Sequence, residues 1–226
     1  SATSCKKRFP CVKAKTTTTE ETRSVNQFSK IDLCIAANVF VTQDATLTED
    51  QVRIAASENV IEHIETKVEG NTLKITSDRC INGNGNITIY IKSNDLTGVS
   101  ISGSGDVIAR EPVESTSMDL DISGSGSIEM ELTATSIDAG ISGSGNMDLT
   151  GFASELTISI SGSGDIEAVT LETNRTNVSI VGSGSADVNV TERLDVSISG
   201  SGNVSYIGQP DLHVSLSGSG DIINNN

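Results

Sequence analysis

The stretch Ile101–Asp106, ISGSGD, decides the fold, because close copies of it return at regular intervals to the end of the chain. The aliphatic residue that opens each copy recurs every 18 to 21 residues. These eight residues are Ile81, Ile101, Ile122, Ile141, Ile160, Ile180, Ile198 and Leu216. The period is too short for a pair of helices or a propeller blade, and it predicts a β-solenoid.

Residues around each copy alternate in character, as they do in a strand with one buried face. Aliphatic residues and glycines occupy one parity, and short polar residues occupy the other. In the seventh copy the first set is Leu194, Val196, Ile198, Gly200, Gly202 and Val204. Successive side chains of a strand point to opposite faces, so we expect this set to face a core and the serines to face solvent.

Two glycines in each copy are the residues that we expect to form the corners of the coils. A glycine on the buried parity indicates either that two backbones approach closely or that the chain turns with a positive φ. The predicted corner residues are Gly83, Gly85, Gly103, Gly105, Gly124, Gly126, Gly143, Gly145, Gly162, Gly164, Gly182, Gly184, Gly200, Gly202, Gly218 and Gly220.

A ligand-binding loop is the alternative interpretation of this motif. A phosphate loop needs a third glycine in register before a helix, or a lysine after the second glycine, and the copies have neither. Calcium-binding β-rolls have a period of about nine residues and a reliable acid, whereas here Asp106 becomes Ser127 or Asn146 in other copies. We therefore predict no metal, no cofactor and a structural corner.

Charge excludes one class of partner. The chain has a formal net charge of −15, although residues 1–23 hold six basic residues and only two acids. Residues 93–226 carry 3 basic and 19 acidic residues. Since binding to phosphates takes clustered Lys and Arg, we predict no nucleic acid as a partner.

The cysteines favour an exported protein. Cys5, Cys11, Cys34 and Cys80 lack the close spacing of zinc ligands, and two disulfides or buried thiols are the alternatives. There is no apolar run long enough to span a membrane. Because Ser1 leads the chain, we expect a signal segment to have been removed and any lipid anchor to lie upstream.

Three regions follow from the change of pattern along the chain. Residues 1–23 are basic and rich in threonine, and we predict a flexible tether there. Residues 24–80 predict a β-rich region with a short helix near SENVIEHIETKVEG, capped by Ser57. Residues 81–226 predict a β-helix of about eight repeats, with 24–226 as one continuous domain as the alternative.

Catalysis has only weak candidates in this sequence. The carboxylate pairs Asp119 with Asp121 and Glu129 with Glu131 suggest a polysaccharide-cleaving site. Each pair is spaced two apart on a predicted strand and so faces solvent, as expected for an acidic surface. We predict that the protein is not an enzyme.

The segments FSKIDLCIAANVFVTQ (28–43) and VEGNTLKI (68–75), together with the repeats, resemble the bacterial auto-transporter adhesin family with a head GIN domain. The resemblance covers about residues 25–226. The chain departs from the family pattern at INGNGN (81–86) and at Val181, which replaces the usual serine.

This resemblance implies an all-β fold, a pectin-lyase-like right-handed parallel β-helix, exported to the bacterial cell surface, outer membrane or periplasm. It also implies adhesion without catalytic residues, and thus host or cell-surface glycans or proteins as partners. A polysaccharide-active enzyme and a passive envelope protein are the alternatives. Because nothing in the sequence caps the last repeat, we also expect homo-oligomers.

Overall fold

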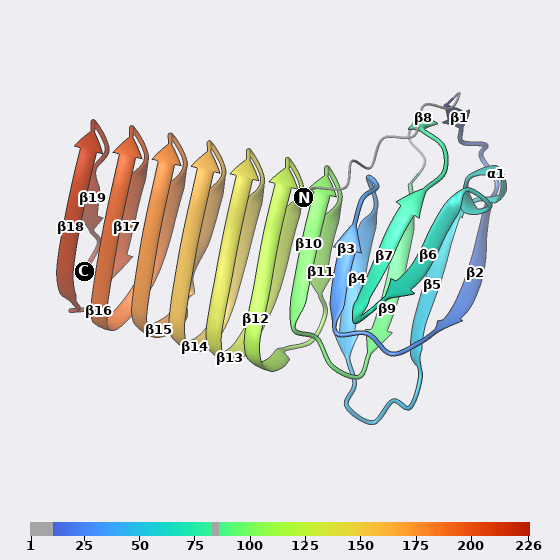
Figure 1. Ribbon diagram of the computed structural model, residues 1–226, viewed down its shortest axis with the longest axis horizontal. Helices are drawn as coiled ribbons and strands as arrows, with labels where there is room; N and C mark the ends of the chain where they lie inside the picture. Colours follow the sequence, from blue (N-terminus) through green and yellow to red (C-terminus); the bar gives the residue numbers. More distant parts are fainter. Residues whose placement is uncertain (1–10, 83–85) are drawn as a thin grey trace.

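The computed structural model describes residues 11–82 and 86–226. Nearly all of its regular structure is strand, and its coils stack in a row from β10 to β18 (Figure 1). The strands and the helix are β1 (Val12–Lys13), β2 (Thr18–Val25), β3 (Lys30–Leu33), β4 (Asn38–Gln43), β5 (Asp50–Ser57), α1 (Glu58–Ile61), β6 (Ile64–Glu69), β7 (Thr72–Ser77), β8 (Ile81–Asn82) and β9 (Thr88–Ser93). The solenoid continues with β10 (Gly98–Gly103), β11 (Asp106–Ala109), β12 (Val113–Gly124), β13 (Ser127–Gly143), β14 (Asn146–Gly162), β15 (Asp165–Gly182), β16 (Ser185–Gly200), β17 (Asn203–Ile207), β18 (Asp211–Gly218) and β19 (Ile222–Asn224).

Parallel pairing in constant register builds the solenoid, as the repeat predicts. We call the sheet formed by the strand segments that lead into a Gly-Ser-Gly corner face A, and the sheet formed by the segments that follow a corner face B. The long strands β13 to β16 contribute a segment to each face. On face A, Ile101 pairs with Ile122 and the column runs on to Leu216. On face B, Val107 pairs with Ile128 and the column runs on to Ile222. The predicted all-β solenoid is confirmed.

Aliphatic side chains from both faces fill the space between them. Ile101, Ile180 and Leu194 are fully buried, while Ser199 and Ser161 on the other parity are exposed. Burial of each such side chain stabilises the fold by about 1.5–3 kcal/mol. The alternation read from the sequence therefore places the core correctly.

The region before the repeats continues the same stack. β3 pairs with β10 and β4 pairs with β11, both in parallel, so residues 30–43 form a coil without a Gly-Ser-Gly motif. A second coil, β7 and β9, packs on the far side of β3 and β4 although it follows them in sequence. The chain from β3 to β19 thus forms one continuous structure.

The prediction that the first repeat begins at Ile81 is wrong. Ile75, not Ile81, pairs with Leu33 in the column that contains Ile101. Ile81 instead lies in β8, which pairs with Val12 of β1 in a separate small sheet. The corner that we predicted at Gly83 and Gly85 lies outside the described residues.

The predicted tether is also wrong where the structure describes it. Residues 1–10 lie outside the described residues, but β2 pairs antiparallel with β5 along its whole length, from Thr18 with Ser57 to Val25 with Asp50. Cys11 forms a disulfide with Cys80. β2 is an edge strand and contains few apolar side chains, so its composition is similar to that of a linker.

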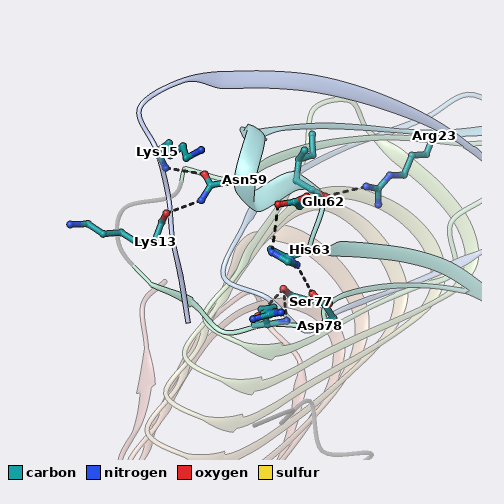
Figure 2. A network of polar contacts seen from close by, with 10 residues as sticks. Lys13, Lys15, Arg23, Asn59, Glu62, His63, Ser77 and Asp78 are labelled. Carbon is teal, nitrogen blue, oxygen red and sulfur yellow. Dashed lines mark hydrogen bonds and ion pairs between the residues drawn. The ribbon is translucent and has the colours of Figure 1, made fainter. Parts of the chain in front are cut away.

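Polar contacts around α1 hold this N-terminal segment in place (Figure 2). Asn59 accepts from the backbone N–H of Lys15 at 3.2 Å and donates to the carbonyl oxygen of Lys13 at 2.9 Å. Arg23 of β2 donates to the carbonyl oxygen of Ile64 at 2.7 Å, and His63 contacts Asp78 at 3.0 Å. These contacts join β1 to α1, β2 to β6, and the turn after α1 to the turn after β7.

The predicted helix exists but is shorter than its periodicity suggests. It ends at Ile61, and Ile64 and Val68 belong to β6, which pairs with β7. Ser57 precedes the helix, yet its hydroxyl donates to the carbonyl oxygen of Lys15 at 2.6 Å instead of capping it. Within the described ranges, no helix has the length and apolar character needed to cross a membrane.

A buried carboxylate fixes the junction between the first two coils. Asp50 accepts from the backbone N–H of Phe28 at 2.9 Å and from that of Asn94 at 3.0 Å. Asp50 is fully buried. Asp50 therefore ties the segment that leads into β3 to the segment that follows β9.

Replacing Asp50 with alanine is expected to lower the free energy of unfolding by about 2 kcal/mol, because two buried N–H groups lose their acceptor. Urea unfolding followed by circular dichroism measures this loss. Asp95→Ala, at an exposed position in the same connection, is the matched control and should change stability by less than about 0.5 kcal/mol. Equal losses in the two variants would contradict the role of Asp50.

Candidate functional site

The predicted corner glycines lie at the edge where face A turns into face B. The first glycine of each pair has φ between +130° and +147°, a conformation that side chains rarely adopt. These residues are Gly103, Gly124, Gly143, Gly162, Gly182, Gly200 and Gly218. They show that the corner turns with a positive φ.

The second glycines show the close approach of backbones. A Cβ atom added at Gly164 would lie 2.5 Å from the carbonyl oxygen of Gly145 and 2.6 Å from a methyl carbon of Ile141. This set is Gly105, Gly126, Gly145, Gly164, Gly184, Gly202 and Gly220, all but the last buried. Both explanations that the sequence left open therefore hold: the second glycines show the close approach alone, and the first glycines from Gly124 onward combine it with a positive φ.

Hydrogen bonds between coils occupy backbone groups of the corner. The N–H of Ser163 donates to the carbonyl oxygen of Gly143 at 2.8 Å, and the same bond recurs in the neighbouring coils. The hydroxyl of Ser127 donates to Asp106 at 2.6 Å. Within residues 11–82 and 86–226, no group of three or more His, Cys, Asp or Glu residues has the arrangement of a metal site.

Face A carries a groove on its outer surface, with a volume of about 440 Å³, across β14, β15, β16 and β18. The surface is hollow here because serines, which have small side chains, lie in register on all four coils. The outward residues that line it are Thr157, Ser159, Asn177, Ser179, Asp195, Ser197, His213 and Ser215. Ile158, Val178, Val196 and Val214 also line the groove, so most of its surface is carbon, and the hydroxyl and amide groups lie along it on four successive coils.

Charged groups lie at one side of this groove. Arg193 makes two hydrogen bonds to Asp195, at 2.6 and 2.8 Å, and these bonds lower the pKa of Asp195. His213 lies 3.8 Å from the same carboxylate. The carboxylate is therefore ionised at neutral pH and held in place by its neighbours.

The carboxylate pairs considered for catalysis lie on opposite faces. Asp119 and Asp121 are on face A, where Asp119 forms an ion pair with Lys30 at 2.7 Å. Glu129 and Glu131 are exposed on face B, and Glu129 stands beside Asp148 of the next coil. The structure does not bring the two pairs together.

Asp121 is the carboxylate with an unfavourable position. Partial burial raises its pKa above the ordinary 3.8, and repulsion from Asp119 and Asp138 adds to the shift, while Lys30 opposes it. A raised pKa in the folded state means that the folded protein binds this proton more tightly than the unfolded chain. Ionised Asp121 therefore costs stability above its raised pKa, and the cost is absent well below pH 3.8.

Asp121→Asn is expected to stabilise the protein slightly at pH 7, by less than about 1 kcal/mol because solvent screens the site, and not at pH 3. Thermal unfolding at both pH values and low salt measures the difference. Glu131→Gln on face B is the control for removal of a negative charge. A destabilised Asp121→Asn protein at pH 7 would contradict the raised pKa.

Comparison with known proteins agrees with this architecture. The family described as "Putative auto-transporter adhesin, head GIN domain" matches residues 27–210. The chain belongs to this family. The resemblance predicted from the sequence is thereby confirmed. No curated protein matches the chain at a significant level.

Several solved structures share this shape. A putative adhesin from Bacteroides fragilis is 28% identical, with a TM-score of 0.89 over 94% of this chain and 99% of that one. A putative lipid binding protein from Parabacteroides distasonis is 22% identical, with a TM-score of 0.79 over 95% and 99% of the two chains. A putative adhesin from Parabacteroides merdae is 20% identical, with a TM-score of 0.76 over 96% and 100%. The two lower identities support the fold alone.

The sequence identified no ligand-binding residue, although it placed the groove residues on the outer parity. Ser179 and Asn177 are ordinary strand residues by composition. Their role depends on Ser159, Ser197 and their neighbours standing in the same columns. Aligning the copies by register, with attention to runs of small outward residues, is the signal that would have located the groove.

Proposed function

We propose that this family member is a non-catalytic, adhesin-like binding protein of the bacterial cell surface. Its partners are cell-surface or host glycans or proteins. Membership of the adhesin family supports the role, and so does the 28% identity to the Bacteroides fragilis protein. The binding surface that we propose is the groove on face A.

The single observation that carries this proposal is the groove itself. It extends over four successive coils, which at about 4.8 Å per coil span roughly 15 Å along the rod. A chain-like ligand that lies along the rod would meet a hydroxyl or amide group at each coil. The coil-to-coil hydrogen bonds hold these groups in fixed positions, so binding costs little ordering of the protein.

Filling the floor of the groove tests the proposal. Ser179→Tyr with Ser197→Tyr places two large side chains in the groove, and both positions face solvent, so folding should be unaffected. Ser123→Tyr, exposed on face A outside the groove, is the matched control. Retention on an array of bacterial and host glycans and matrix proteins is the measurement.

The wild type and the Ser123→Tyr protein should be retained by the same array members, and the double variant at least tenfold less. Thermal unfolding should give the same midpoint for all three proteins. An array that retains none of them would contradict the binding role. Equal retention of all three would contradict the groove as the binding surface.

A further inference from the structure

A second surface cavity lies on face B, at the N-terminal end of the solenoid. It has a volume of about 320 Å³ and is lined mainly by Phe40, Arg53, Tyr90, Lys92 and Arg110. Three strands, β4, β5 and β9, and the turn after β11 supply these residues. Pairing of Arg53 with Tyr90 and of Tyr90 with Phe40 sets them side by side.

Two aromatic rings form the centre of this cavity, and two guanidinium groups cover them. Phe40 and Tyr90 stack with their centroids 5.5 Å apart. The guanidinium carbon of Arg53 lies 4.1 Å from the centre of the Tyr90 ring, and that of Arg110 lies 4.2 Å from the centre of the Phe40 ring. Stacking on a ring fixes each guanidinium plane and leaves its N–H edge available.

Positive charge gathers here although the protein as a whole is strongly acidic. Arg53 is paired with Glu20 at 3.0 Å. Among the described residues, no side chain forms a hydrogen bond or ion pair with Arg110 or Lys92, although the charge of Lys92 attracts the carboxylate of Asp44. Arg110 also lies 5.1 Å from the Tyr90 ring that Arg53 covers, so two like charges share one ring. An anion between them would relieve their repulsion.

Acidic residues on the neighbouring coils limit what this anion is. The row that contains Phe40 continues across face B through Ile108 to Glu129, Asp148 and Glu167. A polyanion lying along the solenoid would meet this acidic column and be repelled. A ligand with one acidic group among neutral groups would not.

We propose that this cavity binds an acidic saccharide through its carboxylate. A carboxylate fits the paired N–H edge of a guanidinium, which makes Arg110 the principal contact and Lys92 a second positive charge. The volume is at the lower end of the range for small-ligand sites and suits one sugar ring. The guanidinium planes that cover the two aromatic rings offer that sugar ring a flat, weakly hydrated surface.

This site lies on the face opposite the groove of face A, and it adds a ligand class to the binding role proposed above. The probe is an oligosaccharide that ends in one galacturonic acid residue, and its neutral counterpart ends in galactose. Calorimetric titration compares both probes for the wild type, Arg110→Gln, Arg110→Lys and the exposed control Arg175→Gln.

The acidic probe should bind the wild type and Arg175→Gln equally, and both should bind the neutral probe at least tenfold more weakly. Arg110→Gln should lose at least tenfold in affinity for the acidic probe. Arg110→Lys should recover only part of the loss, because lysine lacks the planar fork. Equal binding of the two probes, or an unchanged Arg110→Gln protein, would overturn the proposal.

Two further arms separate this site from its alternatives. A glutamate-rich peptide that binds more tightly than the acidic sugar, with loss in Arg110→Gln, would overturn the saccharide and indicate an acidic protein partner. The Ser179→Tyr, Ser197→Tyr protein should bind the acidic probe as the wild type does. Loss of binding in that variant would overturn this site in favour of the groove on face A. If the wild type is retained on the array but does not bind the acidic probe, the saccharide site is overturned and the proposed groove is not.

Discussion

Replacing Gly162 with alanine is expected to lower the free energy of unfolding by about 3–5 kcal/mol, or to prevent folding. Gly162 has φ +131°, and an added Cβ would overlap the carbonyl oxygen of Gly143 in the preceding coil. The strained backbone costs about 1–3 kcal/mol, and the overlap with backbone that cannot move aside adds a similar cost. Urea unfolding measures the total.

Gly103→Ala separates these two causes. Gly103 has a similar φ of +146°, but nothing lies within 4 Å of its added Cβ, because the coil beneath it turns differently. This variant should lose only about 1–3 kcal/mol. A loss at Gly162 no larger than that at Gly103 would show that the close approach of coils does not require glycine.

Ile198→Ala should cost about 3 kcal/mol, whereas Leu216→Ala, one coil further on, should cost less than about 1 kcal/mol. Ile198 is 2% exposed and its removal leaves a cavity in the core. Leu216 pairs with Ile198 in register but is 49% exposed. Leu212 and Val214 on the same strand are also exposed, at 37% and 45%. Urea unfolding at low protein concentration compares the two variants.

The same pair tests the expected homo-oligomer. If a second copy covers β18 in solution, Leu216→Ala will cost more at high protein concentration than at low concentration. An equal cost for Leu216 and Ile198 at every concentration would contradict the exposed last coil. Light scattering on the same samples gives the mass that accompanies either result.

The repeats could be predicted from the sequence because their determinants are local. Alternation around Ile160 or Ile198 sets the buried parity, and paired glycines mark each corner. The N-terminal coils lack these signals, since residues 33–38, LCIAAN, form the corner between β3 and β4 without a Gly-Ser-Gly motif. Stacking of β7 beyond β3 is a long-range pairing that no local pattern specifies.

The two candidate sites could not be predicted for the same reason. Phe40, Arg53 and Tyr90 come from three strands whose register places them together, and Arg110 comes from the turn after β11. The sequence predicts a tether in place of β2 because the stability of this strand depends on its pairing with β5 and its contact with α1, and not on its own composition.

The most direct test measures retention on one array for a variant that lacks corner hydroxyls and a variant with a filled groove. The triple variant Ser144→Ala, Ser163→Ala, Ser183→Ala removes exposed corner hydroxyls, and Ser179→Tyr with Ser197→Tyr fills the groove. We predict that the corner variant is retained as the wild type is and that the groove variant is not. Retention lost in the corner variant and kept in the groove variant would contradict a structural role for the Gly-Ser-Gly motif.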